Sequence, residues 1–105
     1  MNGPITKYDI NRTRLSLIKQ EIFRQFDSYN EFRQEMFPDV KLNTFRQWFK
    51  KPYYISDRRL CHMENTLEIT PAQVRARLTE EFNLPSQLLQ VAKGIKFEFI
   101  EPQLT

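Results

Sequence analysis

The chain has 105 residues, 40% of them hydrophobic, and its 16 Lys/Arg against 13 Asp/Glu give a formal net charge of +3. This length predicts one domain with tails, and the hydrophobic fraction is sufficient for a small core. A single cysteine excludes an internal disulfide, no apolar run approaches the roughly 18 residues that span a bilayer, and no apolar segment of a signal peptide follows Met1. We therefore expect a cytoplasmic protein with no membrane partner.

The N-terminal segment is predicted to contain an arm followed by a helix. Residues 1–10 include Pro4 and several spaced apolar residues, and are expected to form an N-terminal arm or a short strand. From Asn11 to Asp27 the apolar residues keep a helical period, which predicts the first helix.

A second helix is predicted to follow at once. Ser28 and Glu31 have the spacing of a capping box, in which each side chain accepts a hydrogen bond from an unpaired backbone amide. The helix is expected to run from Tyr29 to about Phe37, because Pro38 cannot continue it.

A third, short helix is predicted after Asp39 or Lys41, and it ends near Lys51 because Pro52 follows. Its apolar residues recur at i, i+3 and i+7, which predicts one buried stripe formed by Leu42, Phe45 and Phe49. Trp48 lies three residues after Phe45, so we expect it to pack in the core.

Another face of the third helix carries side chains suited to DNA. Asn43, Arg46, Gln47 and Lys50 recur at i, i+3, i+4 and i+7, and Asn, Gln and Arg are side chains that hydrogen-bond base edges bidentately. No acidic residue lies between Asp39 and Asp57, whereas this stretch holds Lys41, Arg46, Lys50 and Lys51. Such a density of cations creates a strong local field. The pattern favours entry into a DNA groove, and the alternative is an ordinary amphipathic helix with a solvated basic face.

The C-terminal half is predicted to hold two further helices, a short helical turn and a strand. Ser56 can cap a fourth helix, and Thr70 with Gln73 forms a capping box for a fifth helix, which ends near residues 83–85. A helical turn is expected over residues 86–93, and the alternation over residues 95–99 predicts a half-buried strand.

Two segments resemble the Cro/phage-repressor class of helix-turn-helix proteins. The run Val40-Lys41-Leu42-Asn43-Thr44-Phe45-Arg46-Gln47-Trp48 is similar to the family's Val-Ser-x-x-Thr-Ile-x-x-Trp recognition segment. Downstream, the run from Leu60 to Pro71 resembles the family's ending of leucine, glutamate and Leu-Gly-Ile-Thr-Pro, with Glu68 where glycine is usual. The likeness covers roughly residues 11–82.

The chain departs from the family in the second helix. The family has a small Ala there and a Gly four residues later, whereas residues 32–39 contain neither, and the turn to the third helix is one or two residues longer. We therefore expect the second and third helices to cross differently.

The resemblance implies a mainly α, five-helix lambda-repressor-like helix-turn-helix domain over residues 11–84 with a short C-terminal β-strand. It also implies a homodimeric DNA-binding regulator of a bacterium or phage-infected host cell, whose third helix lies in the major groove of a palindromic operator. The implied base-reading residues are Lys41, Leu42, Asn43, Arg46 and Gln47. The implied phosphate contacts are Thr44, Lys50, Lys51, Tyr53 and Arg33. The implied dimerisation segment is residues 85–105, with Ile95, Phe97 and Phe99.

The residues do not predict an enzyme. Cys61 and His62 are adjacent on a helix, so their side chains diverge by about 100° and cannot form a nucleophile–base pair. One Cys and one His cannot make a Cys/His metal site, and two glycines exclude a phosphate-cradling loop of known spacing. We expect no cofactor, no metal and no small-molecule substrate.

Two other functions and one structural question stay open at this point. The chain could be a protein-interaction module, such as an antitoxin or adaptor with an aromatic C-terminal region. It could also bind single-stranded nucleic acid through Tyr53 and Tyr54, which lie next to cations. The C-terminal strand could pair with residues 5–10 of its own chain or with a two-fold mate.

Overall fold

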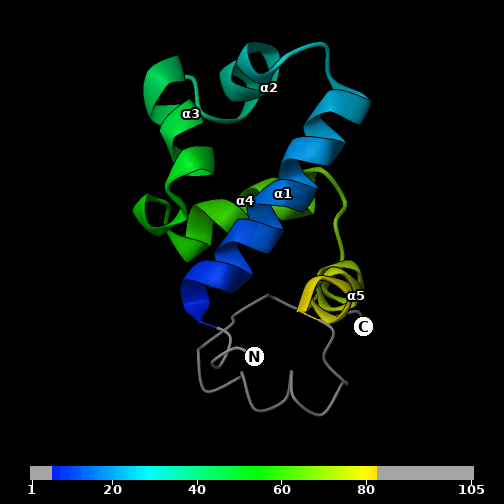
Figure 1. The fold of residues 1–105 in the computed structure, drawn as a ribbon. Helices are drawn as coiled ribbons and strands as arrows, with labels where there is room; N and C mark the ends of the chain where they lie inside the picture. Colours follow the sequence, from blue (N-terminus) through cyan, green and yellow to red (C-terminus); the bar gives the residue numbers. More distant parts are fainter. Residues whose placement is uncertain (1–5, 83–105) are drawn as a thin grey trace.

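The computed structural model describes residues 6–82, and this part of the chain contains five α-helices (Figure 1). They are α1 (Lys7–Gln25), α2 (Tyr29–Met36), α3 (Leu42–Lys50), α4 (Asp57–Thr66) and α5 (Pro71–Phe82), with a 3₁₀ turn η1 (Pro52–Tyr54) between α3 and α4. Residues 6–82 contain no strand. The prediction of a mainly helical fold with five helices is therefore confirmed, whereas the helical turn predicted over 86–93 and the strand over 95–99 lie outside the described residues.

Helix α1 begins at Lys7, four residues before its predicted start at Asn11. The Thr6 hydroxyl accepts a hydrogen bond from the Asp9 amide at 3.1 Å, and the Asp9 carboxylate accepts one from the Thr6 amide at 3.0 Å. This capping box satisfies two amides that would otherwise lack a partner at the start of the helix. The prediction of an arm or strand through residue 10 is wrong for Lys7–Ile10, because Ile10 is buried on the helix instead.

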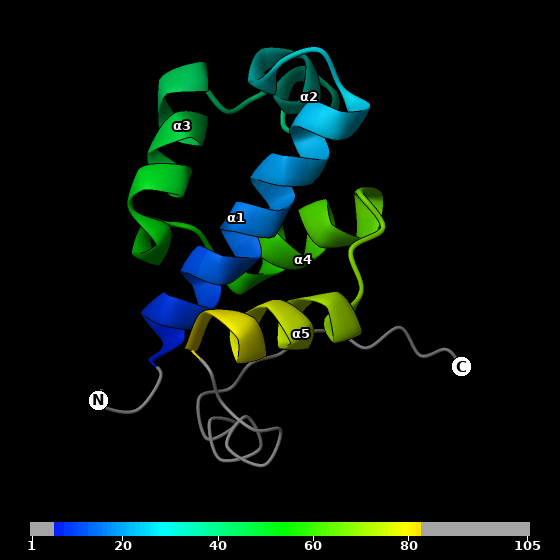
Figure 2. The same ribbon diagram turned by 45° about the vertical axis from the view of Figure 1, so that its right-hand side comes forward.

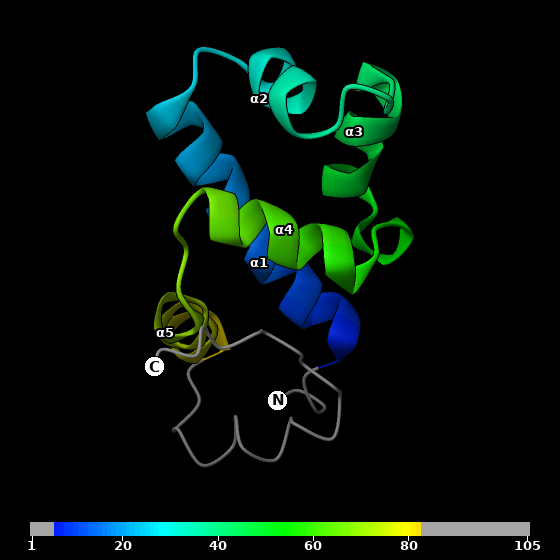
Figure 3. The ribbon, with the colours of Figure 1, turned by 180° about the vertical axis from the view of Figure 1, so that it is seen from behind.

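Helix α1 is the central element of the fold, and it contacts each of the other four helices. Figure 2 shows α5 lying near the beginning of α1 and α2 lying near its end. Figure 3, seen from behind, shows α4 crossing in front of α1. All five helices contribute apolar side chains with no exposed surface, namely Ile18, Ile22, Phe32, Phe45, Leu60, Met63 and Val74. The core therefore lies between α1 and a ring of short helices.

The three predicted helix starts at Ser28, Ser56 and Thr70 are confirmed, because each hydroxyl accepts a hydrogen bond from the amide three residues later. At α5 the box is complete, since the Thr70 amide donates to Gln73 at 2.8 Å. At α2 the predicted reciprocal bond is different: the Glu31 carboxylate accepts from the Asp27 amide at 2.8 Å. Glu31 therefore satisfies an amide one residue before the capping serine.

Helix α4 ends in a Schellman motif that places Glu68 in the left-handed region, with φ 62°. The Ile69 amide donates to the Glu64 carbonyl at 2.8 Å, and the Glu68 amide donates to the Asn65 carbonyl at 3.2 Å. This pair of bonds satisfies carbonyls at the end of a helix, and glycine is the usual residue at the left-handed position because it has no Cβ.

Glu68→Gly should therefore stabilise the protein by about 1 kcal/mol, because glycine adopts this conformation without the steric cost that a Cβ imposes. Urea unfolding monitored by circular dichroism measures the difference. Ala76→Gly, an exposed position inside α5, is the control and should destabilise by about 1 kcal/mol. If Glu68→Gly also destabilised the protein, the left-handed conformation assigned to residue 68 would be wrong.

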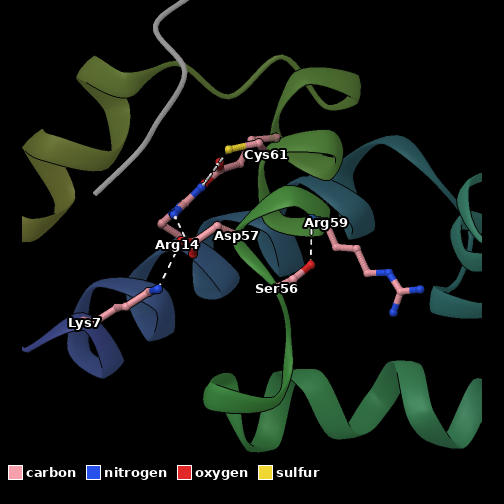
Figure 4. A network of polar contacts seen from close by, with 7 residues as sticks. Lys7, Arg14, Ser56, Asp57, Arg59 and Cys61 are labelled. Atoms are coloured by element: carbon pink, nitrogen blue, oxygen red, sulfur yellow. Dashed lines mark hydrogen bonds and ion pairs between the residues drawn. The ribbon is translucent and has the colours of Figure 1, made fainter. Parts of the chain in front are cut away.

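A buried ion pair joins α1 to α4 (Figure 4). Arg14 is 1% exposed and Glu64 is 0% exposed, and the guanidinium donates to both carboxylate oxygens of Glu64, at 2.8 and 2.7 Å. Burial by itself would lower the pKa of Arg14, but the hydrogen bonds and the charge of Glu64 outweigh it and raise that pKa. The Asp57 carboxylate extends the network, 4.0 Å from Arg14 and 3.1 Å from the Lys7 ammonium.

Glu64→Ala should destabilise the fold by roughly 3–5 kcal/mol, because it removes the carboxylate that Arg14 meets inside the core. Thermal and urea unfolding measure this loss. The double variant Arg14→Met, Glu64→Leu is the control, since replacing both charges by apolar side chains of similar size costs much less. Equal losses in the two proteins would show that packing, and not the charge pair, holds α1 against α4.

Candidate nucleic-acid interface

Helix α3 lies at the edge of the molecule (Figures 1 and 2). Aromatic rings pack against its inner face. Phe45 is 0% exposed and Trp48 is 3% exposed, which confirms the prediction that Trp48 is a core residue. The ring of Phe45 lies 5.3 to 6.5 Å, centroid to centroid, from five other aromatic rings, namely those of Tyr29, Phe32, Phe37, Trp48 and Phe49. Since Phe45 and Trp48 face inward, the positions between them on the helix face outward.

The outer face of α3 and the residues on either side of it carry nearly all of the residues predicted to contact DNA. The exposed members are Lys41, Asn43, Thr44, Arg46, Gln47, Lys50, Lys51 and Tyr53. Within residues 6–82, the four cations of this set form no ion pair. The ion pairs in this part of the chain join Lys7, Arg14 and Arg24 to carboxylates elsewhere. We call this exposed set the α3 surface, and its positive charge is not neutralised by neighbouring carboxylates.

Tyr29 of α2 lies beside one flank of the α3 surface, where its ring stacks on Phe49 at 5.2 Å. Burial raises the pKa of the Tyr29 hydroxyl, and the nearby charge of Arg46 opposes that rise. Arg46 therefore lies on the side of α3 that faces α2.

Two predicted site residues are not fully exposed. Leu42, expected to meet a thymine methyl group, is half-buried at the start of α3. Arg33 is half-buried in α2, where its guanidinium donates to the Val40 carbonyl at 2.7 Å and to Asn30 Oδ1 at 2.8 and 3.1 Å. Arg33 therefore lies at the turn between α2 and α3 and not on the α3 surface. Its guanidinium hydrogen bonds are made within the protein.

The turn between α2 and α3 has an aromatic anchor. The Val40 amide donates to the Phe37 carbonyl at 2.9 Å, and the Phe37 ring lies 5.5 Å from Trp48 and 5.9 Å from His62. A phenylalanine and the Arg33 hydrogen bonds therefore hold this turn where the resembling family uses small residues.

A hollow of about 430 Å³ opens beside α3 on the flank away from Arg46. Its walls are Asn43, Thr44, Gln47 and Trp48 from α3, Tyr54 from η1 and Arg59 from α4. We call it the α3–α4 hollow. The sequence does not predict that Arg59 lies beside α3, because Arg59 follows Trp48 by 11 residues and no local pattern links the two.

The exposed tyrosines form a row that continues from η1 to α1. The Tyr53 ring lies 4.6 Å from the Tyr54 ring and 6.0 Å from the Tyr8 ring. Tyr8 stands at the start of α1, so the row extends beyond the α3 surface toward the N-terminal end of that helix.

Cys61 and His62 contact different elements of the fold. The Arg14 guanidinium donates to the Cys61 sulfur at 3.4 Å, whereas the His62 ring packs edge-on against Phe37. Burial raises the pKa of the Cys61 thiol, and the charge of Arg14 opposes that rise. Over residues 6–82 there is no group of three or more His, Cys, Asp or Glu that could hold a metal ion, and none of the helices there is long and apolar enough to cross a membrane.

Arg33→Met should destabilise the protein by roughly 1–3 kcal/mol, because the Val40 carbonyl loses a charged hydrogen-bond donor in the turn before α3. Urea unfolding measures this difference. Arg46→Met is the matched control, since Arg46 is exposed on α3, and it should change stability by less than about 0.5 kcal/mol. The assigned role of Arg33 fails if its replacement is as mild as that of Arg46.

Comparison of the chain with protein-family models, with curated proteins and with solved structures gives no match.

Proposed function

We propose that the protein is a sequence-specific regulator of transcription that binds double-stranded DNA in the manner of Cro and the phage repressors. In this proposal α2 and α3 are the helix-turn-helix pair, and α3 enters the major groove. The observation that carries it is the α3 surface, where Asn43, Arg46 and Gln47 are exposed side by side among cations that no described carboxylate neutralises.

The dimensions of α3 suit the groove. The major groove is about 12 Å wide and admits one α-helix, which is about 10–12 Å across with its side chains. Asn43 and Gln47 can each make a bidentate contact to adenine, and Arg46 can do so to guanine. Lys41 and Leu42 stand at the start of the helix, where a recognition helix usually meets base edges.

The remaining residues of the α3 surface suit the DNA backbone. Thr44, Lys50, Lys51 and Tyr53 offer hydroxyl and ammonium donors around the readers, and such contacts set the register of a protein on the duplex without reading sequence. Each phosphate neutralised by a cation releases condensed counterions, so binding should weaken steeply as salt rises.

The end of α4 adds support for the family likeness. Glu68 occupies the position where the resembling family usually has glycine, and its φ of 62° is the conformation that favours glycine. The backbone at this position is thus what the family pattern requires, although the side chain differs.

The proposal includes a homodimer, whose contacts are assigned to the segment 85–105 with Ile95, Phe97 and Phe99, outside the described residues. A two-fold dimer would bind a palindrome with half-sites about 34 Å apart, one helical turn of DNA. Selection of bound sequences from a random duplex pool tests both parts, because it should yield a symmetric site with that spacing.

Gel shift with random duplex DNA at low and high salt, with and without unpaired competitor oligonucleotides, separates the alternatives. A protein-interaction module would show no salt-dependent binding to duplex DNA at all. A binder of single-stranded nucleic acid would be competed from the duplex by unpaired oligonucleotides of the same length.

Gln47→Ala should lose roughly 1–3 kcal/mol of binding free energy on the selected site and should accept other bases at one position of each half-site. Lys50→Ala is the matched control from the same helix. It should weaken binding to all sequences about equally and reduce the slope of log K against log salt by about one unit. Fluorescence anisotropy with specific and scrambled duplexes at several salt concentrations measures both effects. The assignment of readers is wrong if the two variants behave alike.

A further inference from the structure

The α3–α4 hollow is lined by groups that donate hydrogen bonds. Its polar walls are two amides, two hydroxyls and one guanidinium, from Asn43, Gln47, Thr44, Tyr54 and Arg59, and none of the lining residues is acidic. The Lys51 ammonium adds a second cation near the rim, 6.0 Å from the centre of the Tyr54 ring. A site with this lining favours an anion that has several oxygen atoms.

Arg59 is held in place by aromatic rings beneath it. Its guanidinium carbon lies 5.0 Å from the centre of the Trp48 ring and 5.6 Å from the centre of the Phe37 ring. A guanidinium placed over an aromatic face is stabilised by the ring, and its planar donor fork matches the geometry of a phosphate. The rings therefore restrict the guanidinium before any ligand arrives, which lowers the entropy lost on binding.

The carboxylates of α4 do not compete for this guanidinium. Asp57 contacts Lys7 and Arg14, and Glu64 is bound by Arg14 on the side of α4 that faces α1. Figure 4 shows Arg59 pointing away from this network. Within residues 6–82 Arg59 forms no ion pair, so its positive charge remains available at the edge of the hollow.

We propose that the α3–α4 hollow binds one backbone phosphodiester of the DNA strand that α3 reads, with Arg59 as its main ligand and with Thr44 and Tyr54 donating hydroxyl hydrogen bonds. This inference rests on the proposed function, because it places the phosphate next to the base readers Asn43 and Gln47. It adds α4 to the DNA-binding surface, and it gives Trp48 a second role as the support of a phosphate ligand.

The test compares Arg59→Gln with Arg58→Gln, a neighbouring exposed cation of α4 that does not line the hollow. Arg59→Gln should lower affinity for the selected duplex about tenfold and reduce the salt slope by about one unit, since one phosphate contact is lost. Arg58→Gln should have a clearly smaller effect on both. Equal effects, or no effect of Arg59→Gln, would overturn the inference.

Tyr54→Phe is a second variant, which removes only a hydroxyl and should not disturb folding. It should lower duplex affinity about threefold, the usual effect of one neutral hydrogen bond. Unchanged affinity would exclude Tyr54 as a ligand. Urea unfolding of each variant shows whether a loss of binding reflects a loss of the folded state.

Trp48 is the only tryptophan in the chain, so its fluorescence reports on the hollow directly. Duplex DNA should change this emission in the wild-type protein and change it less in Arg59→Gln.

Inorganic phosphate titrated alone tests a free anion as the ligand: saturable quenching by phosphate, with duplex affinity unchanged in Arg59→Gln, would overturn the assignment to DNA. If Arg59→Gln binds normally while Gln47→Ala still relaxes specificity, only this inference fails. If the wild-type protein binds no duplex, the proposed function itself fails.

Discussion

The burial of Phe45 is the constraint on which the candidate interface depends. Its ring has no exposed surface and lies among five other aromatic rings from α2, α3 and the turn between them. An α-helix turns by about 100° per residue, so fixing the direction of one side chain fixes all the others on the same helix. With Phe45 and Trp48 inward, Asn43, Gln47 and Lys50 are presented to solvent.

The second organising feature is the separation of charges across α4. On the side facing α1, Arg14 engages Glu64 inside the core, and Lys7 engages Asp57 nearer the surface. On the side facing α3, Arg59 stands over two aromatic rings. The acidic groups of α4 are thus used in joining helices, and Arg59 remains at the surface. This arrangement, more than the net charge of +3, makes one side of the molecule positive.

Much of the fold could be predicted because its helices carry their boundaries in short local patterns. Ser28, Ser56 and Thr70 cap α2, α4 and α5 as expected, and Pro52 follows the end of α3. The predicted start of α1 is wrong for a clear reason: the spacing of Ile5, Tyr8 and Ile10 favours an arm or strand, whereas Thr6 and Asp9 form a capping box that begins the helix earlier. The partners of Glu31 and Arg33 could not be predicted from the sequence, because side chains of this length can reach several backbone groups and only the folded turn selects among them.

The sequence alone determined the number and type of helices in the described part of the chain, and it determined which face of α3 is polar. Both follow from the spacing of apolar residues and from capping contacts that span three or four positions. The tertiary structure decided what lies beside that face. It brought Arg59 and Tyr54 to the flank of α3 and withdrew Arg33 into the turn, because contacts between residues distant in the chain arise only when α1 gathers the short helices around one core.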